Sequence, residues 1–157
     1  MRTVTGNLLD MFDNGDFDII VHGCNCHNNM GGGIAAQIAK RYPKVQNADL
    51  DTVCGDESKL GTVVPVWMSN RWLRWIKKPR IVVNAYTQFH PGADARIEAV
   101  RAAFIDLADW ARRENLEHLS FGIPAIGCGI GGLTWEEVEM EIIYSCNHLD
   151  ITLVEFG

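Results

Sequence analysis

The sequence has no uncharged apolar run of about 18 or more residues, the length that a membrane-spanning helix needs. Its first residues, Met1 to Val4, lack the apolar core and the cleavage site of a signal peptide. Both absences argue against insertion into a membrane and against secretion. We therefore expect no membrane partner and a location in the cytoplasm.

Cysteines are few, and their number is odd. Five are present, without the spacing of a disulfide framework, which favours free thiols in a reducing compartment. Basic residues are also in deficit, since 14 Lys and Arg face 20 Asp and Glu and leave a net charge of −6. A broad surface that follows nucleic-acid phosphates is thus not expected, and an anionic ligand would be held by backbone N–H groups.

The sequence does contain enough apolar residues for one core, because 47% of its 157 residues are hydrophobic. It has no internal repeat and no linker, so we expect one domain over residues 1–157. Strand and helix patterns alternate, which predicts a mostly parallel or mixed sheet covered on both faces. The expected strands are 2–5, 17–21, 62–68, 72–76, 81–86, 118–123 and 151–156, with 62–68 and 72–76 as a hairpin, and the expected helices are 34–42, about 94–111 and about 135–146.

The first of two glycine loops follows a buried strand pattern. Gly31 to Gly33 stand directly before the helix that begins near Ile34. Three successive glycines allow a ligand close to the backbone, and the helix N-terminus offers N–H groups to an anion. Asn25, earlier in the loop, could orient a sugar hydroxyl. A structural turn and an Asn that merely fills it are the alternatives.

The second glycine loop, Gly127 to Gly132, matches G-x-G-x-x-G between a strand and a helix. A dinucleotide-binding fold places this motif in its first βα turn with more βαβ units after it, whereas here the sequence soon reaches Gly157. Neither loop ends in the Gly-Lys-Ser/Thr of a P-loop. The mechanism of a glycine loop that wraps a phosphate ahead of a helix still applies.

Together, the two loops, their order and the elements between them resemble the macro domain, the ADP-ribose-binding module. The resemblance covers the whole chain: residues 6–9 are similar to the family's adenine motif, 20–36 to its loop over the terminal ribose, and 123–133 to its diphosphate loop. These motifs look most like those of ADP-ribose-1″-phosphate phosphatases and of hydrolases that remove terminal ADP-ribose from glutamate. The resemblance implies a three-layer α/β/α fold with a central mixed, mostly parallel sheet.

The resemblance further implies a small-molecule ligand, ADP-ribose or a derivative, and no cofactor. It implies adenine recognition by Asn7 and the Leu8 amide, and contact of Asn25 with the terminal ribose. The other substrate-binding positions that it implies are Asn29, Gly31, Gly32, Gly33, Ile34, Thr87, Gln88, Gly127, Cys128, Gly129, Ile130 and Gly131.

The sequence departs from the family at positions that carry chemistry. The glutamate-directed hydrolases use a lysine and an aspartate where this chain has Gln88 and Gly131, and another branch has an aspartate where this chain has Ala35. Asn7 replaces an aspartate that is common at the adenine position, an exchange that keeps an acceptor. The catalytic groups of the known hydrolase branches are therefore missing.

Asn25 and His27 are the catalytic residues that we predict. Asn25 would orient the ribose, and a neutral imidazole could activate water or protonate a leaving oxygen. A surface role for His27 is the alternative; His90 could also move a proton, whereas His22 is interpreted as a core residue. The first hypothesis is hydrolysis of ADP-ribose 1″-phosphate. The alternatives are a module that only binds ADP-ribose, and removal of ADP-ribosyl or O-acetyl groups.

Two clusters suggest other ligands. His22, Cys24, Cys26 and His27 crowd together, but their C-x-C spacing departs from zinc patterns, so no metal is expected. Residues 71–80 carry five basic residues and two tryptophans, which could stack on nucleic-acid bases. A sheet edge protected by positive charge is the preferred interpretation.

Overall fold

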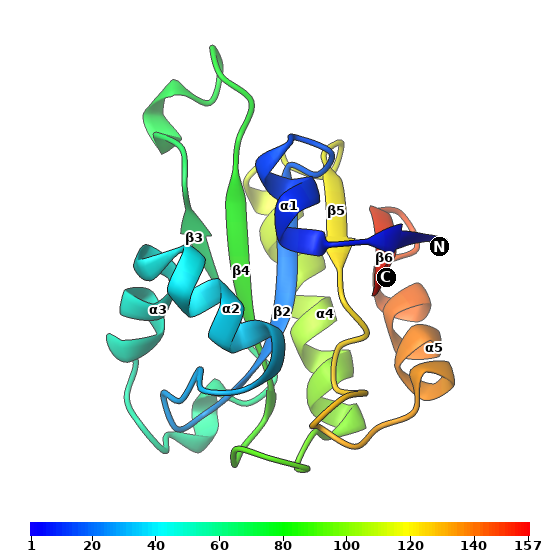
Figure 1. Cartoon of the computed structure of the whole chain (residues 1–157). Helices are drawn as coiled ribbons and strands as arrows, with labels where there is room; N and C mark the ends of the chain where they lie inside the picture. Colours follow the sequence, from blue (N-terminus) through cyan, green and yellow to red (C-terminus); the bar gives the residue numbers. More distant parts are fainter.

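A computed structural model describes all 157 residues (Figure 1). No helix in it is both long and apolar enough to cross a membrane. The strands are β1 (Arg2–Gly6), β2 (Ile19–Asn25), β3 (Val63–Trp67), β4 (Ile81–Gln88), β5 (Ser120–Ile123) and β6 (Asp150–Phe156). The α-helices are α1 (Leu8–Asp13), α2 (Gly33–Arg41), α3 (Pro43–Leu50), α4 (Ile97–Arg113) and α5 (Trp135–Cys146), and short 3₁₀ helices cover Glu57–Lys59 and Arg71–Leu73.

The six strands form one sheet in the order β1-β6-β5-β2-β4-β3. All neighbours are parallel except β3, which runs antiparallel to β4 at one edge. The carboxyl ends of β2, β4 and β5 therefore lie together at one end of the sheet, where parallel α/β sheets place their ligand loops. The predicted mixed, mostly parallel sheet is confirmed.

Helices cover both faces of the sheet because the side chains of its central strands alternate between two apolar cores. In β2, Ile19 and Val21 pack with α4 and α5, whereas Ile20 packs with α1, α2 and α3. Successive strand residues point to opposite faces, so a continuous apolar run is what a strand buried on both sides requires. The three-layer arrangement is confirmed (Figure 1).

The structure adds two helices to those expected. The side chain of Asn7 accepts hydrogen bonds from the backbone N–H groups of Leu9 and Asp10 and so caps the short α1. Helix α2 ends at Arg41, one residue before the predicted end at Tyr42, and Pro43 then occupies the first turn of α3, where its missing N–H costs nothing. Helices α1 and α3 are each eight residues or shorter, which is too short for a clear helical period in the sequence.

The expected hairpin of strands 62–68 and 72–76 is wrong. The first strand exists, but Val63–Trp67 pairs with β4 rather than with the segment that follows it. That segment contains a 3₁₀ helix, and its Trp72 and Trp75 side chains are 85% and 79% exposed. The buried strand β4 offers a better apolar partner. The explanation of residues 71–80 as a protected strand edge falls with the hairpin.

Candidate functional site

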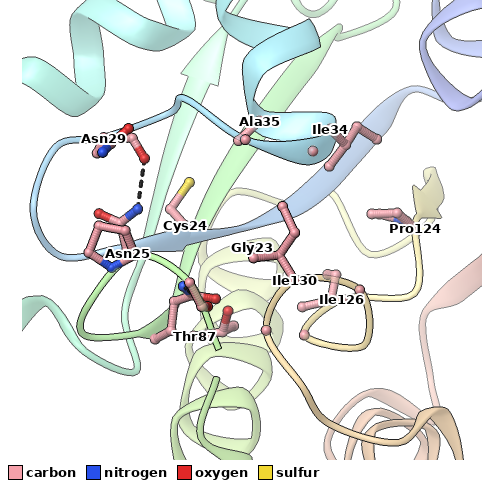
Figure 2. Close-up of a pocket in the computed structure, with 18 of the residues that line it drawn as sticks. Gly23, Cys24, Asn25, Asn29, Ile34, Ala35, Thr87, Pro124, Ile126 and Ile130 are labelled. Atoms are coloured by element: carbon pink, nitrogen blue, oxygen red, sulfur yellow. Dashed lines mark hydrogen bonds between the residues drawn. The ribbon is translucent and has the colours of Figure 1, made fainter. Parts of the chain in front are cut away.

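A cleft of about 520 Å³ lies at the carboxyl ends of β2, β4 and β5, between the two glycine loops (Figure 2). This volume is within the range of sites for small molecules. The residues that line it are Gly23, Cys24, Asn25, Asn29, Gly31, Gly32, Gly33, Ile34, Ala35, Thr87, Gln88, Pro91, Gly92, Pro124, Ala125, Ile126, Gly127, Gly129, Ile130 and Gly131.

The first glycine loop presents backbone donors to this cleft. The first hydrogen bond of α2 joins the Ala36 N–H to the carbonyl oxygen of Gly32 over 3.3 Å. The N–H groups of Gly33, Ile34 and Ala35 precede it and have no partner. Unpaired N–H groups at a helix N-terminus attract anions through both their hydrogens and the helix dipole.

The second glycine loop presents donors from the opposite side. Two of its carbonyl groups are occupied: Gly127 accepts from the Leu133 N–H over 2.8 Å, and Gly131 accepts from the Ala95 N–H over 3.1 Å. The N–H groups of Gly129, Ile130 and Gly131 have no partner. Two sets of free backbone donors therefore flank the cleft.

Gly32 lies where the two loops meet, and Gly131 is a position that only glycine can occupy in this loop conformation. A Cβ atom on Gly32 would lie 3.2 Å from Cδ1 of Ile130, the residue of the second loop that reaches over the first (Figure 2). A Cβ atom on Gly131 would lie 2.7 Å from the carbonyl oxygen of Gly127 and 2.8 Å from Cβ of Ala95. No side chain, and so no aspartate, fits at Gly131 in this loop conformation.

Asn25 organises the first loop from the end of β2. Its Nδ2 donates to the carbonyl oxygen of Asn29 over 2.7 Å, and its Oδ1 accepts from the His27 N–H over 2.9 Å (Figure 2). The Asn29 side chain in turn accepts from the Gly31 N–H over 2.9 Å. A register shift in the β2–β4 pairing falls between Cys24 and Asn25, so that Asn25 pairs with Gln88 and the two amide side chains stand on adjacent strands.

Gln88 and Thr87 bring the end of β4 to the same cleft. Nε2 of Gln88 donates to the carbonyl oxygens of His90 and Gly92 over 2.8 and 3.0 Å. The amide is thus fixed by the loop after β4, in the position that the resemblance gives to a lysine. Thr87 is buried and lies close to Gly23 of β2, where a Cβ atom would be 2.8 Å from its Oγ1.

No charged side chain lines the cleft. Cys24 is its one ionisable residue, and burial, reinforced by nearby Asp49, raises the pKa of its thiol well above the usual range. The thiol therefore stays protonated and is a poor nucleophile. Anion binding in this cleft has to come from backbone dipoles rather than from lysine or arginine.

Several predicted residues lie outside the cleft lining. His27 has its ring stacked on His90 with centroids 5.0 Å apart and edge-on to Phe89 at 4.8 Å, and its Nε2 is buried without a partner. Asn7 and Leu8 belong to the α1 cap, and the Cys128 side chain packs against the core. Lining residues that the sequence did not single out are Gly23, Cys24, Pro91, Gly92, Pro124, Ala125 and Ile126.

The other suggested clusters do not join this site. No three His, Cys, Asp or Glu residues gather as a metal site would require. The basic segment with Trp72 and Trp75 connects β3 to the start of β4, at the end of the sheet opposite the cleft (Figure 1). Arg71 and Arg74 in that segment are paired with Glu114.

His22 is buried beneath the cleft and predicts an acid-sensitive fold. Its Nε2 lies 2.6 Å from Oδ1 of Asn84, and burial lowers the pKa of the imidazole to about 4 against the opposing effect of that bond. Unfolded protein binds the proton near the ordinary pKa of 6.5, so stability is present above that pH and is lost as the pH falls toward 4. Urea unfolding should give a free energy roughly 2 kcal/mol lower at pH 5 than at pH 7.

The variant His22→Gln is the control for this pH effect. It cannot take up the proton, so its free energy of unfolding should change much less between the same two pH values. An equal loss in both proteins would assign the effect to other groups.

Comparison with known proteins identifies the class of this fold. A family model described as the macro domain matches residues 21–142. A 17.5 kDa protein of Enterobacteria phage T4 is 31% identical over 157 residues, which cover 99% of this chain and 96% of the relative. A DNA ADP-ribosyl glycohydrolase of Mycobacterium tuberculosis is 30% identical over 134 residues, or 85% of this chain and 36% of the relative.

A third relative and a solved structure are also similar to this chain. An ADP-ribose 1″-phosphate phosphatase of Candida albicans is 27% identical over 128 residues, which cover 77% of each protein. The solved macrodomain of Mycobacterium tuberculosis DarG superposes with a TM-score of 0.78 at 26% identity, over 98% of this chain and 96% of that one. The chain spans about a third of the length of the glycohydrolase relative, so the likeness concerns one part of that protein.

Proposed function

The chain belongs to the macro domain family, and on that premise we propose that its cleft binds ADP-ribose and hydrolyses ADP-ribose 1″-phosphate to ADP-ribose and phosphate. The observation that carries the proposal is the cleft itself, which is lined by two sets of unpaired N–H groups and by no charged side chain. The diphosphate would lie between the loops at Gly33 and Ile130. Backbone N–H groups bind phosphate in this way without a formal positive charge.

The direction of the cleft suggests where the terminal ribose and the adenine would lie. The terminal ribose would lie at the Asn25 and Gln88 end, where amide groups are fixed by the loops. Adenine would lie toward Pro124 and α1. Because Oδ1 of Asn7 already accepts two N–H groups, we assign its amide nitrogen, rather than an acceptor, to the adenine edge.

The uncharged cleft favours phosphate release over removal of a linked ADP-ribosyl group. Transfer of a phosphoryl group to water passes through a loose transition state, so positioning and stabilisation of charge by N–H groups supply most of the catalysis. Water would attack the phosphorus, the bond from phosphorus to the ribose oxygen would break, and a proton from the water would pass to that oxygen, which leaves as a hydroxyl of ADP-ribose. A mechanism in which a lysine attacks the ribose would need a lysine in the cleft, and none lines it.

For His27 we propose a supporting role in place of the predicted catalytic one. A general acid or base has to come within hydrogen-bond reach of the atoms that exchange the proton, and His27 does not line the cleft. We therefore assign His27 to support of the loop, through its ring contacts with Phe89 and His90. Activity of His27→Ala within about tenfold of the wild type would agree with support, because a positioned acid or base contributes about 100-fold or more.

Phosphate release from ADP-ribose 1″-phosphate tests the proposed function. We expect release that depends on enzyme concentration and is inhibited by ADP-ribose, the product. The glycohydrolase likeness over 85% of the chain makes a DNA oligonucleotide carrying ADP-ribose the second substrate to test. Release of ADP-ribose from DNA without release of phosphate would replace the proposed reaction, and binding of ADP-ribose with neither product would reduce the protein to a binding module.

A further inference from the structure

A buried lysine stands behind the first glycine loop, outside the cleft lining. Lys59 ends the 3₁₀ helix Glu57–Lys59, and it is only 8% exposed. Its Nζ donates to Oδ1 of Asn28 over 2.6 Å and to Oγ1 of Thr52 over 2.8 Å. The ammonium also lies over the ring of Tyr86, 5.1 Å from the centroid.

Packing alone does not explain a lysine at this position. Lys59 forms no ion pair, and the acid buried nearby, Asp49, accepts its hydrogen bond from the Tyr86 hydroxyl over 2.7 Å. Removing an ammonium from water is costly unless the protein satisfies its donors, and a methionine would fill a similar volume without that cost. The hydrogen bonds of Lys59 are therefore the feature to explain.

Those bonds fix the turn of the ligand loop. Asn28 adopts a left-handed backbone conformation with φ of +54°, and its Nδ2 donates to the carbonyl oxygen of Thr52 over 2.8 Å. Lys59 satisfies the other end of the same amide. Asn28 lies between Asn25 and Asn29, the residues whose hydrogen bond closes the loop over the cleft. Hydrogen bonds that fix Asn28 therefore also restrict the positions of Asn25 and Asn29.

We propose that Lys59 is a positioning residue for the terminal-ribose end of the cleft, acting through Asn28 on Asn25. This inference rests on the proposed function, because it assigns the terminal ribose to Asn25. Lys59 touches no part of the diphosphate site. Its loss should loosen the loop at the ribose end and leave the N–H groups of α2 and of the second glycine loop in place.

Comparing ADP-ribose with ADP isolates this effect, because ADP lacks the terminal ribose. In calorimetric titrations, Lys59→Met should weaken ADP-ribose binding about tenfold and change ADP binding by less than about twofold. The exposed Lys40 of α2 gives the matched control Lys40→Met, which should bind both ligands like the wild type. Thermal unfolding of Lys59→Met checks that the variant is folded at the temperature of the titration; loss of the lysine leaves no buried charge uncompensated, because Lys59 forms no ion pair.

A double mutant tests whether Lys59 acts through Asn28. Asn28→Gly keeps the left-handed backbone accessible but removes the side chain that Lys59 holds. The combined variant should lose no more ADP-ribose affinity than the more damaged single variant. Additive losses, equal losses for ADP and ADP-ribose, or unchanged ADP-ribose affinity would each overturn the inference. Wild-type protein that binds neither ligand would instead overturn the proposed function on which it rests.

Discussion

Gly131→Ala is expected to weaken ADP-ribose binding about 100-fold, the largest loss from a single added methyl group in this cleft. The new Cβ atom would lie 2.7 Å from the carbonyl oxygen of Gly127 and 2.8 Å from Cβ of Ala95. Both are closer than real Cβ contacts allow, so the loop has to move. Movement takes the N–H groups of Gly129 and Ile130 away from the diphosphate. Titration calorimetry with ADP-ribose measures the loss.

Gly129→Ala is the matched control in the same loop. A Cβ atom there meets no other atom within 4 Å, so the loop keeps its conformation and the loss of affinity should be much smaller. The melting temperature of Gly129→Ala should stay close to the wild type, because the added Cβ atom meets no neighbour. Equal losses in the two variants would show that the geometry of this loop does not determine binding.

Asn25→Ala is expected to lower kcat for phosphate release about 100-fold or more, because the reacting end of the substrate loses its fixed amide. The substitution also leaves the Asn29 carbonyl oxygen and the His27 N–H without their partners. The loop then no longer presents one conformation to the ribose. Steady-state rates with ADP-ribose 1″-phosphate give kcat and KM separately.

Asn25→Asp separates contact with the substrate from organisation of the loop. The carboxylate still accepts from the His27 N–H but cannot donate to the Asn29 carbonyl oxygen. It also brings a negative charge to an uncharged cleft, so KM should rise for the anionic substrate. An unchanged kcat in both variants would remove Asn25 from the reaction.

The sequence predicted the two glycine loops because their signal is local. Each stands between a strand pattern and a helix pattern, and the order of strands then brings both loops to one end of the sheet. The fold class followed from the same alternation. Strand pairing was less accessible: the exposed segment 72–76 looked like a partner for 62–68, whereas β4 offers a buried apolar ladder.

Within the site, the sequence did not predict the directions in which side chains point. Nothing in the residues around His27 showed that its ring would stack on His90 rather than enter the cleft. The hydrogen bonds of Asn28 with Lys59 and Thr52 could not be predicted either. They join residues that are 24 to 31 positions apart in the sequence and that meet only because of the path of a loop. Such contacts depend on how the loop between α3 and β3 folds back, and no sequence period encodes that path.

Titration of the wild-type protein with ADP-ribose, compared with AMP, tests whether the two glycine loops hold a diphosphate. We expect one site per chain with micromolar affinity for ADP-ribose and at least about 100-fold weaker binding of AMP, which lacks the diphosphate bridge between the loops. Affinity should depend little on salt concentration, since no charged side chain lines the cleft. Equal affinity for AMP and ADP-ribose, or no binding of ADP-ribose at millimolar concentration, would show that the loops do not bind the diphosphate.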